Sequence, residues 1–318
     1  MSIFKLDPAF KDYIWGGTSL RDEYGKKCDY DKVAESWELS CHKDGPSVVA
    51  DGEYKGLTLN EYIEKAGKGV LGKNCERFEN FPILIKLIDA KDNLSVQVHP
   101  DNDYAMRVEG EYGKTEMWYV VDCDEGATLL YGFKHEITKE EFARRIADNT
   151  LLEVTNAVPV KKGDVFFIKS GTLHAIGKGI LIAEIQQNSN TTYRIYDYGR
   201  VGKDGKPREL HVDKALDVTK LAPAEQYPET PVEKKDGYDI KLLSKCEYFT
   251  TYRVNVETKA ELDADENSFN SILVLEGEPV ISGGETVSAK KGESVFISAG
   301  TGKYTVDGKC TFVLTKID

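Results

Sequence analysis

Residues 160–176 read VKKGDVFFIKSGTLHAI, and residues 289–305 read AKKGESVFISAGTGKYT. The two stretches align without gaps, because each has a Lys-Lys-Gly turn, a short apolar run and a Gly-Thr pair at the same spacing. Self-similarity of this kind indicates a structural unit that the chain builds twice. In the alignment His174 meets Lys303, so only the first copy keeps a histidine at this position.

The rest of the chain is dominated by short runs rich in Val, Ile, Phe and Tyr that end at Gly, Asn or Asp. Many short strands with few helices between them favour a sandwich or a barrel, so we predict a mainly β protein. The clearest strand candidates are FPILIKLIDA (81–90), EMWYVVD (116–122) and ILIAEIQQ (180–187).

Helical periodicity is confined to a few segments. Residues 57–72 carry apolar residues at helical intervals, and residues 137–156 (ITKEEFARRIADNTLLEVTN) begin with Thr138 and Glu141 at capping-box spacing. The second segment interrupts a series of strands. It therefore predicts a small helical insertion around residues 137–150.

A candidate linker covers residues 219–239, where three prolines and a charged run break the strand pattern. We predict a catalytic domain at 1–235 and a second, metal-free domain at 236–318. The second domain carries no recognisable ligand set. Its expected role is to cover apolar surface of the first domain or to mediate dimerisation, so the chain is a monomer or a homodimer.

The formal charge of −12 argues against a general nucleic-acid binder or a protein of anionic membranes, because a polyanion needs a basic surface. No apolar run approaches the ~20 residues that span a bilayer, and the first residues do not resemble a leader, so we expect a cytoplasmic protein. The six cysteines form no C-x-x-C pair, so any metal must use other ligands.

One strand combines apolar and chemically active residues. In LSVQVHPDNDYA (94–105) the alternation of an extended chain puts Gln97 and His99 on one face and Val96 and Val98 on the other. That polar face fits a metal or substrate site, but it also fits a strand that turns its polar side to water. The fragment alone leaves both interpretations open.

The stretch from Gly163 to His174 resembles the second conserved motif of the cupin superfamily, G-x5-P-x-G-x2-H, with Lys169 in place of the usual proline. Together with YIWGG (13–17), AESWELSCH (34–42), QVHP (97–100) and KTEMWYVV (114–121), it makes the chain resemble the type I mannose-6-phosphate isomerases of the shorter bacterial branch. The resemblance implies two cupin (jelly-roll) β-barrels. It also implies a metal-dependent isomerase that interconverts mannose 6-phosphate and fructose 6-phosphate through an enediol.

The resemblance further implies a metal site built from His99, Glu116 and His174, with Gln97 as a less certain fourth ligand or as a substrate contact. Such nitrogen and oxygen ligands with an open coordination position suit one catalytic Zn²⁺ per chain. Other divalent metals, such as manganese or iron, suit the same ligands.

For the isomerisation itself we expect Glu184 to be the base, since an apolar strand raises the pKa of a carboxyl group toward the operating range. Arg194 resembles the active-site arginine of the family and would stabilise the enediolate or bind phosphate. Lys114 would face inward beside Glu116 and assist ring opening or proton transfer. The alternative for each of these two strand residues is a position without a catalytic role, with Glu184 facing solvent and Lys114 exposed.

The substrate is expected to be a small sugar phosphate. The residues predicted to bind it are Gln97, Ser95, Lys86, Trp15, Arg200 and Lys214, of which Lys86, Arg200 and Lys214 supply the cations for the phosphate. Trp15 would either pack over the sugar or anchor the core. Two other functions fit the same residues: an isomerase of another sugar phosphate, and a metal-containing cupin that binds sugars without turnover.

Overall fold

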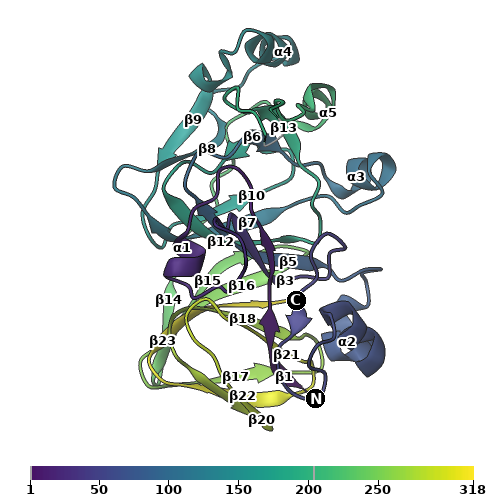
Figure 1. The fold of residues 1–318 in the computed structure, drawn as a ribbon, viewed down its shortest axis with the longest axis vertical. Helices are drawn as coiled ribbons and strands as arrows, with labels where there is room; N and C mark the ends of the chain where they lie inside the picture. The colour runs from purple at the N-terminus through teal and green to yellow at the C-terminus, as the bar shows by residue number, and fades with distance from the viewer. Residues whose placement is uncertain (1, 203–204) are drawn as a thin grey trace.

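The computed structural model describes residues 2–202 and 205–318, and Figure 1 shows their β-sheets stacked in layers. Sheets of five, six, eight and four strands follow one another along the long axis of the molecule. The prediction of a mainly β fold is confirmed. Within the described ranges, no helix has the length and apolar character needed to cross a membrane.

The first pair of sheets holds most of the N-terminal two thirds of the chain. In spatial order the six-stranded sheet is β10 (Val165–Ile168), β7 (Glu116–Cys123), β12 (Ile180–Gln187), β5 (Ile83–Ala90), β3 (Glu35–Leu39) and β2 (Ala9–Lys11). The five-stranded sheet is β13 (Tyr193–Tyr196), β6 (Val96–Val98), β11 (His174–Ala175), β8 (Thr128–Phe133) and β9 (Thr155–Pro159).

The second pair of sheets is built mainly from the C-terminal part. The eight-stranded sheet is β14 (Val232–Lys235), β15 (Tyr238–Lys245), β16 (Thr250–Val256), β23 (Cys310–Lys316), β18 (Asn270–Gly277), β21 (Ser294–Ile297), β1 (Ile3–Asp7) and β4 (Val48–Val49). The four-stranded sheet is β17 (Lys259–Ala264), β22 (Gly302–Asp307), β19 (Val280–Gly283) and β20 (Glu285–Ser288).

The internal repeat has a direct structural counterpart. In the gapless alignment Val165 meets Ser294 and Ile168 meets Ile297, and these residues are the ends of β10 and β21. Gly163 and Gly292 both adopt positive φ, near +91° and +86°, a backbone conformation that glycine adopts without strain. The two pairs of sheets therefore share one design.

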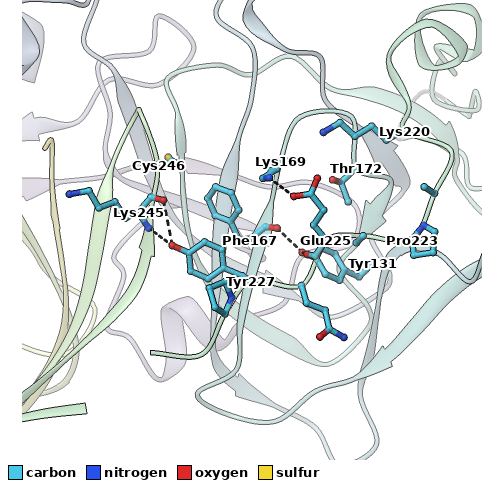
Figure 2. Close-up of a pocket in the computed structure, with 14 residues that line it drawn as sticks. Tyr131, Phe167, Lys169, Thr172, Lys220, Pro223, Glu225, Tyr227, Lys245 and Cys246 are labelled. Carbon is cyan, nitrogen blue, oxygen red and sulfur yellow. Dashed lines mark hydrogen bonds and ion pairs between the residues drawn. The ribbon is translucent and has the colours of Figure 1, made fainter. Parts of the chain in front are cut away.

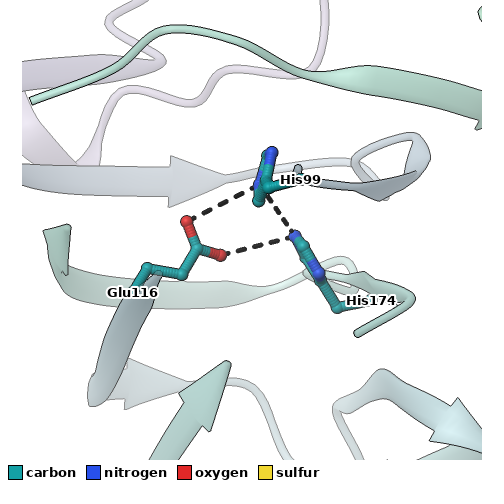
Figure 3. Close-up of side chains that lie close together, drawn as sticks. All are labelled: His99, Glu116 and His174. Atoms are coloured by element: carbon teal, nitrogen blue, oxygen red, sulfur yellow. Dashed lines mark hydrogen bonds and ion pairs between the residues drawn. The ribbon is translucent and has the colours of Figure 1, made fainter. Parts of the chain in front are cut away.

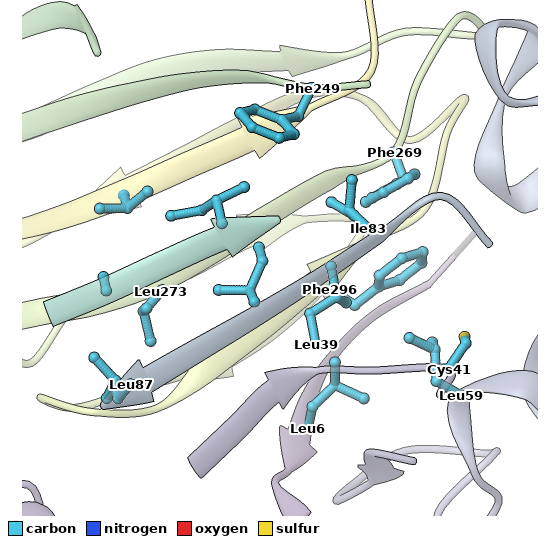
Figure 4. Packing of buried hydrophobic residues seen from close by; sticks show 14 of the residues in the cluster. Leu6, Leu39, Cys41, Leu59, Ile83, Leu87, Phe249, Phe269, Leu273 and Phe296 are labelled. Atoms are coloured by element: carbon cyan, nitrogen blue, oxygen red, sulfur yellow. The ribbon is translucent and has the colours of Figure 1, made fainter. Parts of the chain in front are cut away.

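An apolar core joins the two units. Figure 4 shows side chains of the six-stranded sheet packed against side chains of the eight-stranded sheet. Ile83 and Leu87 of β5 lie on one side of this core, and Leu273 and Phe296 lie on the other. The six-stranded sheet thus has both faces covered, which explains the nearly continuous apolar runs of β5 and β12.

The N-terminal strand does not stay with the first unit. β1 pairs antiparallel with β21, so that Phe4 lies opposite Phe296. The division into residues 1–235 and 236–318 stays a prediction, but this pairing means that a cut at residue 235 would not separate the two units cleanly.

The helices are short and lie at the edges of the sheets. They are α1 (Ser19–Asp22), α2 (Leu59–Ala66), α3 (Asn102–Val108), α4 (Lys139–Ala147) and α5 (Val212–Val218). α4 is the helical insertion that the sequence predicts, and it packs with α5 over the five-stranded sheet. The predicted helix at 57–72 is divided, since α2 ends at Ala66 and a short 3₁₀ turn covers Lys68–Leu71.

Candidate active site and metal centre

Strand register brings the predicted residues of the five-stranded sheet together. β6 lies between β11 and β13, and Gln97 is directly opposite His174 on one side and Arg194 on the other. Side chains that are directly opposite on neighbouring strands share one face of the sheet. His99 follows at the end of β6, and its ring contacts that of His174. Gln97 and Arg194 line the pocket beside these two rings.

The facing sheet supplies the acidic and basic groups. β12 lies between β5 and β7, and Glu184 is opposite Lys86 on one strand and Trp118 on the other. The indole N–H of Trp118 donates to Glu184 Oε2 at 2.9 Å. Glu184, Lys86 and Glu116 are almost completely buried, so their charges must be balanced locally.

His99, Glu116 and His174 form a tight group of potential metal ligands (Figure 3). The two Nε2 atoms lie 3.1 Å apart. Glu116 Oε2 is 3.6 Å from His99 Nε2, and Glu116 Oε1 is 3.3 Å from His174 Nε2. All ligand atoms lie within 4.8 Å of one another.

The hydrogen bonds of the two rings fix which nitrogen is free. His99 Nδ1–H donates to the carbonyl oxygen of Thr191 at 2.9 Å, and His174 Nδ1–H donates to that of Thr172 at 2.8 Å. Each Nε2 of the neutral rings therefore keeps a free lone pair beside the Glu116 carboxylate, as in metal-binding histidines. Burial lowers the pKa of His99 well below its usual range and that of His174 to about 4, which keeps both rings neutral.

The carboxylate of Glu116 completes a donor set that fits a cation. Among the residues that the structure describes, Glu116 Oε1 has no hydrogen-bond donor, and Oε2 has only the ion pair with Lys114. Burial, followed by the negative charge of Glu184, raises the pKa of Glu116 to about 8. A divalent cation would hold this carboxylate ionised. It would also bind the lone pairs of the two histidine Nε2 atoms, which otherwise face each other.

A row of alternating charges runs away from this group across the six-stranded sheet. Lys114 Nζ is 3.1 Å from Glu116 Oε2 and 3.8 Å from Glu184 Oε1. Lys86 Nζ is 3.2 Å from Glu184 Oε1 and 3.4 Å from Glu35 Oε2. When Glu116 is ionised, the row of three carboxylates and two ammonium groups has one excess negative charge, which a bound cation would balance.

A polar pocket of about 230 Å³ opens above this row. Trp15, Ile88, Leu94 and Ile176 form its apolar wall. Its remaining walls are polar or aromatic and include residues from both sheets: Tyr13, Glu35, Lys86, Ser95, Gln97, Lys114, Glu184, Asn190, Thr192, Arg194 and Arg208.

Comparison with known proteins identifies the family. The mannose-6-phosphate isomerase ManA of Bacillus subtilis is 39% identical over 98% of this chain and 97% of its own length. The chain belongs to the type I phosphomannose isomerase family. The model of the type I phosphomannose isomerase catalytic domain matches residues 3–126, and that of the mannose-6-phosphate isomerase cupin domain matches residues 239–317.

A relative from another organism and a solved structure support this assignment. The mannose-6-phosphate isomerase of Streptococcus mutans is 38% identical over 93% of this chain and 92% of its own length. The crystal structure of the mannose 6-phosphate isomerase from Bacillus subtilis superposes with a TM-score of 0.93 at 38% identity, with 99% of each chain covered. The prediction of two cupin units with a helical insertion is therefore confirmed by the match to this family.

Seven of the residues singled out in the sequence line the pocket of this phosphomannose isomerase. They are Trp15, Lys86, Ser95, Gln97, Lys114, Glu184 and Arg194. Trp15 is only 4% exposed and packs in the core with Ile88, while it also lines the pocket, so its position is compatible with core anchoring and with a sugar contact. Lys114 and Glu184 are buried, which rules out the alternatives that place them in solvent.

The expectation that the pKa of Glu184 is raised is wrong. Burial alone would raise the pKa of its carboxyl group, but Lys114, Lys86 and the Trp118 hydrogen bond outweigh burial and lower the pKa to about 2. Two carboxylates act on Lys86 in the opposite direction to burial. Burial alone would lower the pKa of this lysine, but Glu35 and Glu184 outweigh burial and raise it. Sequence periodicity identified an apolar strand but could not show that two lysines flank its one carboxylate.

Two predicted phosphate ligands lie elsewhere. Lys214 Nζ is 2.6 Å from Glu109 Oε1, and Arg200 pairs with Asp197; neither side chain is among the described residues that line the pocket. The pocket wall instead contains Arg208, whose Nε donates to Asp197 Oδ2 at 2.7 Å. Arg208 lies in KPREL, which carries no motif, so the sequence offered no signal for it.

Proposed function

We propose that this protein interconverts mannose 6-phosphate and fructose 6-phosphate as a zinc-dependent isomerase in the cytoplasm. The observation that carries the proposal is the group of His99, Glu116 and His174 next to a pocket that holds a buried carboxylate and two arginines. Full-length similarity to named mannose-6-phosphate isomerases supports the choice of substrate. A monomer or a homodimer stays our prediction for the assembly.

The metal would be held by the Nε2 atoms of His99 and His174 and by the Glu116 carboxylate. Gln97 would add its amide oxygen, since its amide nitrogen lies 3.4 Å from His174 Nε2 and an exchange of the two amide atoms brings the oxygen there. When bound, the metal supplies Lewis acidity that polarises the C1 and C2 oxygens of the sugar.

Glu184 is our candidate for the base that moves the proton. Its low pKa means that it is ionised at neutral pH and free to accept a proton from C2 of the aldose. In the enediolate the proton of the C2 hydroxyl moves to the C1 oxygen, and the same carboxyl group then returns its proton to C1, so the ketose forms with no net gain or loss of protons. Trp118 holds one carboxylate oxygen through its indole N–H, which orients the other toward the pocket.

Lys114 and Lys86 would stabilise the charge that develops during this transfer. Both ammonium groups lie within 4 Å of Glu184 Oε1 and are already fixed by neighbouring carboxylates. Preorganised charges in a water-poor site stabilise a transition state without reorganisation at the moment of reaction. Lys114 lies closest to the metal group, so it is the group best placed to stabilise the enediolate oxygen.

Arg194 and Arg208 are our candidates for binding the phosphate. Burial, and next the positive charge of Arg208, lowers the pKa of Arg194, so the two guanidinium groups share a positive field. Asp197 accepts from Arg200 and from Arg208 and so balances only part of the charge of the three arginines. Guanidinium groups bind phosphate oxygens with two parallel hydrogen bonds.

The test is a coupled assay that follows fructose 6-phosphate formed from mannose 6-phosphate. Purified protein is measured as prepared, after chelation, and after zinc is restored. We expect turnover that disappears with the chelator and returns with the metal. The metal content of each sample is determined in parallel, so that activity is compared at known occupancy.

Absence of turnover in fully metal-loaded protein would contradict the proposal. If mannose 6-phosphate still bound to that protein, the non-catalytic sugar-binding function would replace the isomerase. If another sugar phosphate were converted instead, the substrate assignment would be wrong while the mechanism remained.

A further inference from the structure

A second pocket, of about 540 Å³, lies where the linker crosses the first unit (Figure 2). The walls come from three parts of the chain: strands β8 and β10 with the turn that follows β10, the linker, and the end of β15. The residues that line it are Tyr131, Phe167, Lys169, Thr172, Lys220, Ala222, Pro223, Ala224, Glu225, Gln226, Tyr227, Pro228, Lys245 and Cys246.

Three aromatic side chains form a rigid apolar wall. The Tyr131 hydroxyl donates to the Phe167 carbonyl oxygen at 2.7 Å, and the ring of Phe167 lies 5.0 Å from that of Tyr227. The Tyr227 hydroxyl accepts from the backbone N–H of Lys245 at 2.7 Å. Each aromatic ring is held by a backbone group or by another ring, so the apolar wall is formed before any ligand arrives. Small-molecule sites have this size, this apolar lining and this position between structural units.

The rim of the pocket is cationic at the point where the sequence departs from the cupin motif. Lys169 replaces the usual proline and pairs with Glu225 of the linker, as Figure 2 shows. Lys220, on the same rim, makes no ion-pair contact among the residues that the structure describes, although, after Lys169, its charge helps to lower the pKa of Glu225. One ammonium group is therefore available for an anion, and Lys169 becomes a second if it exchanges Glu225 for that anion.

The wall of this pocket is also the support of the proposed metal centre. The turn after β10 holds both histidines: Gly171 N–H donates to the His99 carbonyl oxygen at 2.8 Å, and the Thr172 carbonyl accepts from His174 Nδ1–H. The linker is attached to the same turn, because Lys220 N–H donates to the Gly171 carbonyl oxygen at 2.8 Å. Tyr131 of the pocket wall is also the direct partner of His174 on the neighbouring strand.

We propose that this pocket binds a small organic anion with a ring-shaped apolar body, and that its occupation changes the affinity of the neighbouring metal centre. The ring stacks among Tyr131, Phe167 and Tyr227, while the anionic group pairs with Lys220 and Lys169. The turn Lys169–Thr172 carries the effect, since it contacts the ligand on one side and positions both histidines on the other. The coupling to metal rests on the proposed function, whereas the binding site does not.

The first test uses 1-anilinonaphthalene-8-sulfonate, an aromatic anion whose fluorescence rises in apolar surroundings. We expect one molecule to bind per chain. Lys220→Glu should weaken binding by about fivefold or more, because an attraction becomes a repulsion. Ala222→Trp should abolish binding by filling the pocket. Lys32→Glu, at an exposed lysine outside the pocket, is the matched charge control and should leave binding unchanged.

The second test measures coupling by competition between the protein and a chelator for zinc, with and without the fluorescent anion. We expect the zinc affinity to change by about fivefold or more, the lower end of usual coupling, and the anion affinity to change by the same factor when zinc is bound. In Ala222→Trp the zinc affinity should no longer respond to the anion.

Equal binding of the anion by wild type, Lys220→Glu and Ala222→Trp would overturn the assignment of the site. Displacement of the anion by mannose 6-phosphate in proportion to substrate binding would also overturn it, because the anion would then occupy the catalytic pocket. An unchanged zinc affinity would overturn the coupling. A failure of the proposed function appears separately, as metal-loaded wild type that binds the anion but has no isomerase turnover.

Discussion

Glu184 is the residue on which the proposed chemistry depends most. Its carboxylate forms an ion pair with Lys86, lies 3.8 Å from Lys114 and accepts a hydrogen bond from Trp118. It is not one of the proposed metal ligands. A change at Glu184 should therefore separate catalysis from metal binding. This separation distinguishes a base from a ligand.

We expect Glu184→Gln to lower kcat by about 10²-fold to 10⁴-fold, the usual contribution of a general base, while zinc content stays at that of wild type. Steady-state kinetics and metal analysis on the same preparation check both parts. Glu38→Gln is the matched control, because Glu38 is equally buried but pairs with Lys26 outside the pocket. A wild-type kcat in Glu184→Gln would remove Glu184 from the mechanism.

The buried histidines predict how the metal-free protein responds to acid. The pKa of His174 falls from 6.5 to about 4 on folding, so the unfolded chain binds the proton first as pH decreases. The contribution of the neutral His174 to the free energy of unfolding should be fully present above pH 6.5. The free energy of unfolding should then fall by about 3 kcal/mol as pH decreases to 4. Urea unfolding of chelated protein at several pH values measures this slope.

His174→Asn is the reference for that experiment, since the titrating ring is removed while the carboxylates nearby remain. Its stability should decline less steeply over the same range of pH. Identical slopes for the two proteins would show that His174 is protonated as easily in the folded state as in the unfolded state.

At the residue scale, prediction from sequence succeeded where a residue lies inside a recognisable motif or on an alternating strand. Gln97 and His99 could be placed on one face because a strand alternates. In the structure Gln97 lines the pocket and His99 belongs to the group of potential metal ligands. The pKa of Glu184 depends on Lys86, which is distant in sequence, and the position of Arg208 depends on Asp197, which lies across a loop. No local pattern contains that information.

At the scale of elements, the two helices with a Thr-x-x-Glu start differ in how they use it. In α2 Thr58 and Glu61 form a complete capping box. In α4 Thr138 accepts from Glu141 N–H, but the carboxylate of Glu141 turns to Arg145 at 3.2 Å. The capping box predicted for α4 is thus only half formed, because a basic side chain one turn later competes for the carboxylate.

Double-mutant cycles should detect this difference. We expect Thr58→Ala and Thr138→Ala each to cost about 1 kcal/mol of stability through the lost cap. The coupling energy should reach about 0.5 kcal/mol or more between Thr58 and Glu61, and should be close to zero for Thr138 and Glu141. Chemical denaturation of the single and double alanine variants gives both values. Equal coupling energies in α2 and α4 would contradict the hydrogen bonds described for α4.

Strand positions were predictable where apolar runs are long, as in β5 and β12, because burial on both faces requires such runs. The repeat also predicted correctly that β10 and β21 correspond. The partners of β1 were not predictable, since IFKLD carries no signal for a strand almost 300 residues later. Pairing between distant segments is decided by the whole core.

At the scale of the whole molecule, the N-terminal strand is a structural part of the second unit. Phe4 is 2% exposed and packs against Tyr62 at 4.7 Å and Phe296 at 5.4 Å between ring centroids. This contact lies in the core that joins the two pairs of sheets and away from the pocket.

Phe4→Ala should therefore lower the free energy of unfolding by about 3–5 kcal/mol, the usual cost of removing a buried phenylalanine. The kcat of the folded enzyme should stay at the wild-type value. Denaturant unfolding and the coupled assay measure the two quantities, and Tyr30→Ala, at an exposed ring, is the control with a small effect. A stable Phe4→Ala variant with reduced kcat would reverse this assignment of roles.

The pairing of β1 with β21 also sets the order of events during protein synthesis. Residues Ile3–Asp7 are synthesised long before their partners Ser294–Ile297. A nascent chain cannot close the eight-stranded sheet before β21 has been made, so the edge of β1 that pairs with β21 stays open to mispairing until then. A chain that stops before β21 keeps this edge unpaired, which distinguishes such a truncated product from a chain that contains both strands.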